Sequence, residues 1–182
     1  MEIRYFDNSA TTRIKEEVFK EMVPYLSLEY GNPSSIYSIG RNAKRAIEEA
    51  RKRVASLINC KPEEIYFTSC GSESDNTALK GIAYTNKDKG KHIITSKIEH
   101  PAILHSCQNL EKNGFEVTYL DVDESGFINL ENLKNSIRKD TILISIMFAN
   151  NEIGTIEPIE DIAKIAHQNN IIFHTDAVQA AR

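Results

Sequence analysis

Residues 67–76, with the sequence FTSCGSESDN, have the composition of an anion-binding site. An apolar run stops there at a turn of small residues, and a helical pattern begins directly after it. The backbone N–H groups of such a turn and of a first helical turn lack internal partners, and the helix dipole adds partial positive charge. Gly71 lets a ligand approach the backbone closely. We therefore predict a phosphate site at Gly71 and Ser72.

The alternative for the same residues is an ordinary capped turn between a strand and a helix. Ser72 is a good N-cap residue, and Asp75 three positions later completes the S-x-x-[DE] pattern of a capping box. Ser72 could thus cap the helix or contact a phosphate. Neither G-x-x-x-x-G-K-[ST] nor G-x-G-x-x-G occurs in the chain, which disfavours a nucleoside triphosphate or a dinucleotide as the ligand.

Three further apolar runs end in residues able to do chemistry: Glu99 with His100, Asn151 within the segment NNE, and Asp176. Ligands of open parallel sheets bind beyond the carboxyl ends of the strands. An anion site, an imidazole, an amide and a carboxylate at one edge match the needs of pyridoxal phosphate (PLP), whose ring becomes an electron sink when a carboxylate keeps its nitrogen protonated. We predict PLP as the cofactor, although each residue alone could be a cap or turn residue.

The elements that must position these residues alternate between strand and helix, which is the βαβ pattern of a parallel, doubly wound α/β sheet with helices on both faces. Residues 141–147 are nearly all apolar, as expected of a central strand covered on both sides. Two further helices, 16–26 and 41–58, precede this region and flank a cluster of turn formers at 30–35. The predicted strands are 65–68, 92–96, 116–120, 141–148 and 171–174, and the predicted helices between them are 73–84, 101–112, 130–137 and 159–168.

Composition excludes several classes of protein. With 182 residues, 41% hydrophobic and 26% charged, the chain has the composition of a soluble globular domain, and its net charge of −4 gives no nucleic-acid footprint. We expect no membrane span and no signal peptide, hence a cytoplasmic protein. Three cysteines without a CxxC pair and five histidines without an HxxxH or HExxH pattern lead us to assign no metal. Cys70 is expected to be a buried packing thiol.

Taken together, the motifs resemble those of cysteine desulfurases, the class-V, fold-type I PLP enzymes of iron–sulfur cluster assembly and nitrogen fixation. Six motifs occur in the order found in that family and extend from Tyr5 to Gln179. They are YFDNSATT (5–12), YGNPSS (30–35), FTSCGSESDN (67–76), EHPA (99–102), NNEIG (150–154) and HTDAVQ (174–179).

The resemblance implies a role for each matched residue. His100 would stack on the cofactor ring and assist proton transfer, and Asp176 would pair with the pyridine nitrogen; these two are the predicted catalytic residues. Asn151 and Gln179 would contact the phenolic oxygen of the cofactor. The predicted cofactor-binding residues are Gly71, Ser72, His100, Asn151, Asp176 and Gln179, and the predicted substrate-binding residues are Asn8, Ala10 and Asn151.

The resemblance also implies an activity and partners. The family removes sulfur from L-cysteine, leaving L-alanine and an enzyme persulfide that is passed to a sulfur-acceptor scaffold protein, and its members are homodimers. Two alternatives stay open at this point. One is another class-V PLP enzyme, such as a selenocysteine lyase or an aminotransferase, and the other is a non-catalytic fragment or scaffold.

The chain departs from the family pattern by stopping at Arg182. Nothing in it matches the family's cofactor-binding lysine motif or its persulfide cysteine. We therefore expect residues 1–14 to contribute to a small domain and residues 15–182 to form a partial large PLP-binding domain, with a sheet that is incomplete at the C-terminus. Tyr66 and Phe67 would then lack strand neighbours, and the chain alone would bind cofactor weakly and not turn over.

Overall fold

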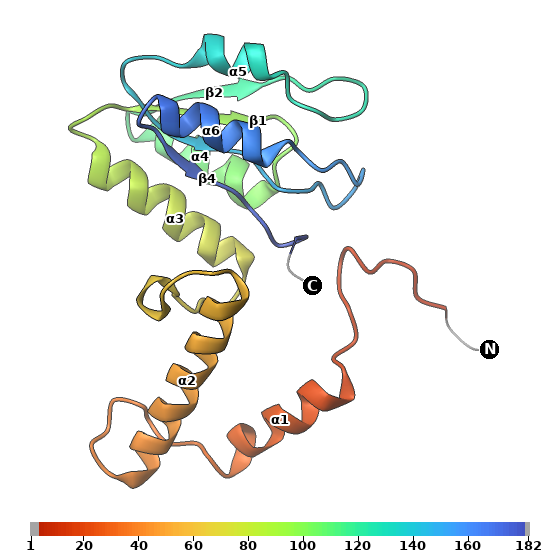
Figure 1. Cartoon of the computed structure of the whole chain (residues 1–182), viewed down its shortest axis with the longest axis vertical. Helices are drawn as coiled ribbons and strands as arrows, with labels where there is room; N and C mark the ends of the chain where they lie inside the picture. Colours follow the sequence, from red (N-terminus) through yellow and green to blue (C-terminus); the bar gives the residue numbers. More distant parts are fainter. Residues whose placement is uncertain (1–3, 181–182) are drawn as a thin grey trace. The chain divides into compact units, whose positions relative to one another are not determined.

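The computed structural model describes residues 4–180, whose backbone forms two compact units that divide between Phe67 and Thr68 (Figure 1). The first unit holds three helices and the second holds a sheet with four helices. The functional boundary expected after residue 14 stays a prediction.

The first unit contains α1 (Glu16–Ser27), α2 (Ser38–Leu57) and the short 3₁₀ helix η1 (Pro62–Glu64). Both helices predicted from the sequence are confirmed. The turn before α2 closes tightly, since a Cβ at Gly31 would lie 2.4 Å from the carbonyl oxygen of Ile39 and one at Gly40 would lie 2.5 Å from that of Asn32. Glycine at both positions therefore permits the close backbone approach that starts α2.

The second unit is built on a four-stranded sheet in the order β2-β1-β3-β4, with every neighbouring pair parallel. The strands are β1 (His92–Ser96), β2 (Glu116–Leu120), β3 (Thr141–Ser145) and β4 (Ile172–His174). The expected α/β architecture with a parallel sheet is confirmed. All five residues of β3 are buried and the strand lies between β1 and β4, which confirms its predicted internal position.

Helices cover both faces of this sheet: α3 (Gly71–Asn86) and α4 (Pro101–Lys112) lie on one face, and α5 (Leu130–Ser136) and α6 (Ile159–Gln168) on the other. Successive strand side chains point to opposite faces. Ile93 accordingly joins the apolar cluster of α3 and α4, whereas Ile94 joins the cluster of α5 and α6. Burial on both sides explains why the strands are apolar at consecutive positions.

The strand predicted at 65–68 is wrong. This segment pairs with no strand among the described residues, and Tyr66 and Phe67 are 83% and 52% exposed. The Arg51 guanidinium lies 5.1 Å from the centre of the Phe67 ring and donates a hydrogen bond to the carbonyl oxygen of Ile65. β-Branched and aromatic residues favour an extended backbone, but a strand also needs a neighbour for its N–H and C=O groups.

Candidate active site

The N-terminus of α3 differs from the cap expected at Ser72. The helix begins at Gly71, Cys70 is its N-cap, and Ser72 lies inside the first turn. Glu73 Oε2 accepts hydrogen bonds from the backbone N–H of Ser69 at 2.7 Å and from the Ser69 hydroxyl at 2.6 Å. The capping alternative for Ser72 and Asp75 is therefore not formed, because Ser72 lies inside the first turn and Asp75 is buried. Ser72 is exposed, and its hydroxyl is not used as a cap.

The expectation that Cys70 is a buried packing thiol is also wrong. Cys70 is exposed because it is the extended residue that leads into α3, with φ −166° and ψ 170°. Hydrogen bonding from the Glu73 backbone N–H, and then from the Ser69 hydroxyl, lowers the pKa of the Cys70 thiol.

Gly71 and Asp176 are brought together by the turn that follows β4. A Cβ at Gly71 would lie 2.9 Å from Cγ2 of Val178, so the start of α3 packs directly against this turn. Asp176 Oδ1 in turn accepts a hydrogen bond from the Val178 backbone N–H at 3.0 Å. The N-terminus of α3 and the Asp176 carboxylate thus both contact Val178.

Asp176 is 9% exposed, and of its two carboxylate oxygens only Oδ1 takes part in a hydrogen bond found within residues 4–180. Its carbonyl oxygen accepts from the Phe148 N–H at 2.8 Å, which extends the pairing of β3 and β4 by two residues. A buried carboxylate held at the backbone with one free oxygen is suited to pairing with a cationic ring nitrogen.

Asp75 is a buried acid that sequence reasoning assigned to a cap. It is 5% exposed and lies on the inward stripe of α3 that continues at Leu79 and Ala83. Burial, followed by the negative charge of Asp176, raises the pKa of Asp75 to about 6. Its spacing of four residues from Leu79 is the signal that could have identified its inward position.

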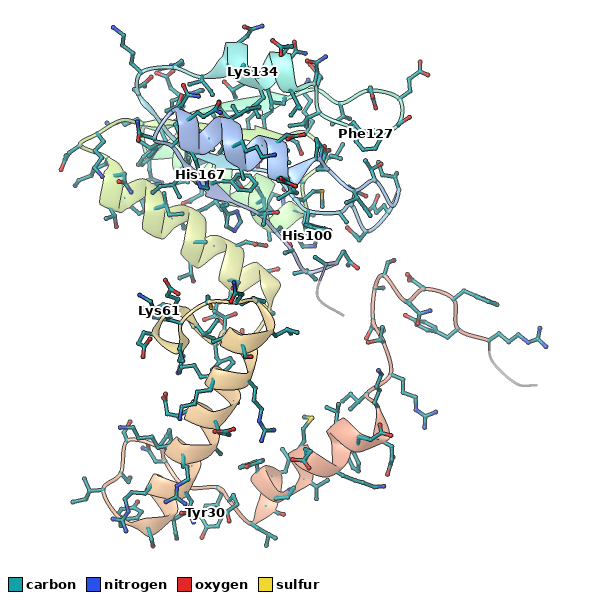
Figure 2. All side chains as sticks on the ribbon, in the orientation of Figure 1. Tyr30, Lys61, His100, Phe127, Lys134 and His167 are labelled. Carbon is teal, nitrogen blue, oxygen red and sulfur yellow. The ribbon has the colours of Figure 1, made fainter. Side chains whose placement is uncertain are left out.

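His100 is the N-cap of α4, and its Nδ1 atom accepts a hydrogen bond from the Ala102 N–H at 3.1 Å. The capping alternative is therefore observed, and it also holds the exposed imidazole in one orientation at the sheet edge (Figure 2). Whether this ring stacks on a cofactor stays a prediction. The charge of Asp176 raises the pKa of Asp75, and that of His100 lowers it.

Asn150 and Asn151 have separate roles in the segment after β3. Asn150 Nδ2 donates to the Ile98 carbonyl at 2.9 Å, while its Oδ1 accepts from the N–H groups of Glu152 and Ile153. Asn151 is half-buried, and no hydrogen bond of its amide occurs within the described residues 4–180. Asn150 therefore anchors the loop and leaves the amide of Asn151 available for a ligand.

The remaining predicted residues lie in exposed turns. Gln179 belongs to the turn closed by the hydrogen bond from the Ala180 N–H to the Ala177 carbonyl at 2.9 Å. Asn8 and Ala10 lie in the first unit, in a turn where the Ala10 N–H donates to the Asp7 carbonyl at 3.3 Å. A role of Asn8 and Ala10 in binding substrate stays a prediction.

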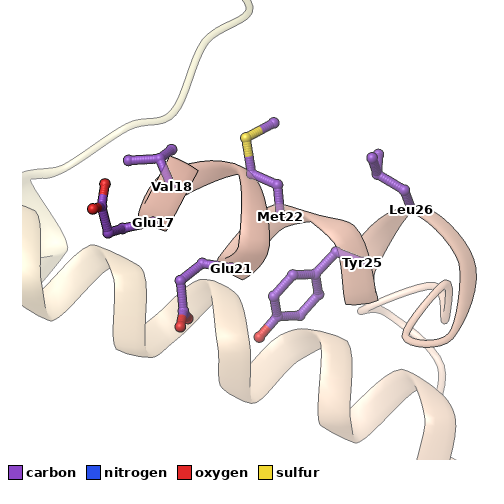
Figure 3. A pocket seen from close by; sticks show the side chains of 6 residues that line it. All are labelled: Glu17, Val18, Glu21, Met22, Tyr25 and Leu26. Carbon is purple, nitrogen blue, oxygen red and sulfur yellow. The ribbon is translucent and has the colours of Figure 1, made fainter. Parts of the chain in front are cut away.

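A groove of different character lies along α1 in the first unit, and it contains none of the predicted residues (Figure 3). Glu21 and Tyr25 point toward the neighbouring helix, whereas Val18, Met22 and Leu26 point away from it.

In residues 4–180, no group of three or more His, Cys, Asp or Glu side chains could hold a metal ion. The helices of this described part are too short or too polar to cross a membrane.

The Aminotransferase class-V family model matches residues 4–182. The chain belongs to the class-V aminotransferase family. This family is PLP-dependent in general, and the resemblance to cysteine desulfurases read from the sequence is confirmed by its relatives. The chain is 62% identical over 176 residues to "Cysteine desulfurase IscS" of Methanosarcina thermophila and 60% identical to the protein of the same name from Clostridium botulinum (strain Kyoto / Type A2).

These alignments cover 97% of the chain and 44% of each relative, so the chain spans less than half the length of these curated class-V relatives. Two solved structures each match with a TM-score of 0.94. One, titled "NIFS-LIKE PROTEIN", is 44% identical and is matched over 97% of this chain and 49% of its own. The other, "SspA in complex with cysteine", is 42% identical and is matched over 98% of this chain and 51% of its own. The fold-type I assignment is thereby confirmed.

Proposed function

We propose that this chain acts in a PLP-dependent cysteine desulfurase, which removes sulfur from L-cysteine and leaves L-alanine and an enzyme persulfide. The observation that carries the proposal is the junction of Gly71, Val178 and Asp176, where the N-terminus of α3 meets a buried carboxylate. The names of the relatives favour a desulfurase over the selenocysteine lyase and aminotransferase alternatives.

The residues at this junction fit PLP. The lack of a side chain at Gly71 lets Val178 pack against the start of α3, and the first N–H groups of the 16-residue helix α3 carry partial positive charge suited to a phosphate. The Ser72 hydroxyl is free of capping and adds a donor. When bound, PLP supplies an electron sink that stabilises negative charge at the α-carbon of an amino acid.

Each residue has a defined task in this proposal. Asp176 holds the proton on the ring nitrogen, Asn151 and Gln179 donate hydrogen bonds to the phenolic oxygen, and His100 covers the ring and moves a proton to or from the substrate. Asn151 also binds the substrate carboxylate, and the substrate roles of Asn8 and Ala10 are proposed from the family resemblance alone. Nothing in this chain is assigned the covalent cofactor lysine or the persulfide cysteine.

The wider context belongs to the same proposal. We place the enzyme in the cytoplasm as a homodimer that delivers sulfur to a scaffold protein for iron–sulfur cluster assembly, in line with the relatives named IscS. Weak cofactor binding and no turnover by the 182-residue chain alone remain a prediction.

The test is complementation. The purified chain is mixed with a polypeptide comprising the part of the Methanosarcina thermophila relative that it does not span. We expect the mixture to acquire the visible absorbance of bound PLP and to release alanine from L-cysteine, with the complete relative as the positive control. D176N should lower alanine release by at least about 100-fold, since a preorganised charge partner is lost. D88N, at an exposed aspartate just beyond α3, is the matched control and should have no effect.

A mixture that folds but neither binds PLP nor releases alanine, while the complete relative does both, would contradict the proposal. Equal alanine release by D176N and the unmodified chain would contradict the assignment of Asp176.

A further inference from the structure

The His174 ring is held by Ser145 at Nδ1 and faces Asp75 with Nε2. Across the β3–β4 pair, His174 lies opposite Ser145, and its Nδ1 atom is 2.9 Å from the Ser145 hydroxyl oxygen. Its Nε2 atom is 3.9 Å from Asp75 Oδ1 on α3. The side chains of His174 and Asp75 are 14% and 7% exposed. If the Ser145 hydroxyl donates to Nδ1, the ring carries its hydrogen on Nε2, facing the Asp75 carboxylate.

The same geometry connects His174 to Asp176, two residues further along. The Ile146 N–H donates to the His174 carbonyl at 3.1 Å, and the Phe148 N–H donates to the Asp176 carbonyl at 2.8 Å. Paired backbone therefore continues through both residues, and side chains two apart on an extended chain share one side. His174 and Asp176 consequently lie on the side of the strand that α3 covers with Asp75.

The charges around this group influence one another. The Asp176 charge helps raise the pKa of Asp75 to about 6, whereas His100 opposes that shift. Burial lowers the pKa of His174, and Asp176 acts against that shift. Asp176 is also one of the causes that raise the pKa of Glu99. Buried acids clustered in this way favour a cation among them.

We propose that His174 and Asp75 are positioning residues for Asp176, holding its carboxylate in place for the cationic ring nitrogen of PLP. The Ser145 hydroxyl holds the imidazole at Nδ1 while Nε2 faces Asp75, the imidazole fixes the end of β4, and the Asp75 carboxylate adds negative charge near Asp176. The inference rests on the proposed function. It assigns His174 and Asp75 a role in cofactor binding that requires no contact with the cofactor.

The test compares PLP with an analogue that lacks only the ring nitrogen. Equilibrium dialysis measures the affinity of the complemented mixture, in which the chain is joined by the part of the Methanosarcina thermophila relative that it does not span, for PLP and for the analogue in which the ring nitrogen is replaced by carbon. We expect the mixture with the unmodified chain to prefer PLP by at least about tenfold, because only PLP can form the charge-assisted hydrogen bond. D176N should abolish this preference, and H174N and D75N should reduce it to about threefold or less. H167N, at an exposed histidine of α6, and D88N are matched controls that should retain it.

A merely structural role of His174 would weaken the binding of both compounds equally, so the ratio of the two affinities separates the roles. The ring ¹⁵N resonances of His174 in the mixture with the unmodified chain provide a second measurement that does not depend on a variant's folding. They should shift on addition of PLP more than on addition of the analogue.

The outcomes are distinguishable. If the complemented mixture binds neither compound, or both equally, the proposed role of the ring nitrogen is wrong and this inference fails with the proposed function. If the mixture prefers PLP and D176N loses the preference, but H174N and D75N keep it in full, the inference alone is overturned. Identical His174 shifts with the two compounds would also overturn it.

Discussion

Glu99 Oε1 accepts a hydrogen bond from the Met147 backbone N–H at 3.0 Å, so a side chain from the loop after β1 holds the loop after β3. The Ser96 hydroxyl donates to the same oxygen at 2.7 Å. Glu99 is 4% exposed, and its Oε2 atom has no hydrogen-bond partner within residues 4–180. This interaction fixes the two loops that carry His100 and Asn151.

The Glu99 carboxyl should make stability fall as pH rises. Burial raises the pKa of Glu99 to about 7 from an ordinary 4.5, so the folded state binds the proton more tightly than the unfolded state between these values. E99Q mimics the protonated acid and should remove this dependence. Relative to the unmodified chain, its free energy of unfolding should therefore increase by about 3 kcal/mol between pH 4.5 and 8. Urea denaturation at each pH measures it.

E124Q is the matched control, because Glu124 is exposed. A flat difference between E99Q and the unmodified chain across this pH range would show that Glu99 is not a buried acid with a raised pKa.

The buried His92 ring should make stability fall as pH falls, which is opposite to the effect of Glu99. It is fully buried, with Nδ1 2.7 Å from the Thr141 hydroxyl and Nε2 2.8 Å from the Thr118 hydroxyl. Burial, and then the nearby Arg138 charge, lowers its pKa below 6.5, while Asp140 and Glu116 act against that shift. The stability that this neutral ring contributes is present above pH 6.5 and is lost as pH falls toward the folded-state pKa.

H92Q should therefore be less stable than the unmodified chain at about pH 7.5, and the gap should narrow as pH falls to about 5. Taking the difference between the two proteins cancels the effect of Glu99, which acts in the opposite direction. H167Q at an exposed histidine is the control, with a change within about 0.5 kcal/mol. A gap between H92Q and the parent that stays constant or widens in acid would refute the prediction.

Two glycines of α3 should respond differently to alanine. A methyl group at Gly71 would meet Val178, whereas one at Gly81 has no neighbour within 4 Å. In the complemented mixture, G71A should lower PLP affinity by about tenfold by displacing the turn that holds Asp176, and adding V178A should restore it. G81A should leave affinity unchanged and raise the free energy of unfolding by about 0.5–1 kcal/mol. Equal affinities of G71A and G81A for PLP would count against the Gly71 site.

Cysteine reactivity should separate Cys70 from Cys107. Cys70 is exposed with a lowered thiol pKa, while Cys107 is fully buried and desolvation raises its pKa to about 12. Because the thiolate is the reactive form, iodoacetamide should modify Cys70 at least about 100-fold faster than Cys107. Peptide mapping by mass spectrometry over time measures both rates, and the ratio should collapse in denaturant. Comparable modification rates of Cys70 and Cys107 in the folded protein would contradict the exposure of Cys70 and the burial of Cys107.

Much of the second unit could be predicted because its signals are local. The predicted bounds of β1, β2, α4 and α6 agree with the structure residue by residue. Apolar runs, Pro101 at the first helical position and period-2 or period-3.6 patterns are properties of neighbouring residues. The strand at 65–68 could not be judged this way, since an extended segment becomes a strand only when another strand pairs with it.

Some residues of the candidate site could be predicted from local sequence, and others could not. His100, Asn151 and Asp176 follow apolar runs, and that position alone identifies them as candidates. The importance of Asp75 and Glu99 escapes such reasoning, because it comes from burial against residues distant in sequence: Asp75 meets His174, and Glu99 meets Met147. The four-residue spacing from Leu79 indicates that Asp75 points inward, but the groups that Asp75 meets there follow only from the fold.

The sequence by itself determined the alternation of strands and helices, the polar residues that follow the strands, and through six ordered motifs the family. Only the tertiary structure decided which acids lose their water, which nitrogen of His174 faces Asp75, and that Gly71 and Asp176 share Val178 as a neighbour. The physical reason is that desolvation and charge coupling depend on distances through space, which the order of residues along a chain does not contain.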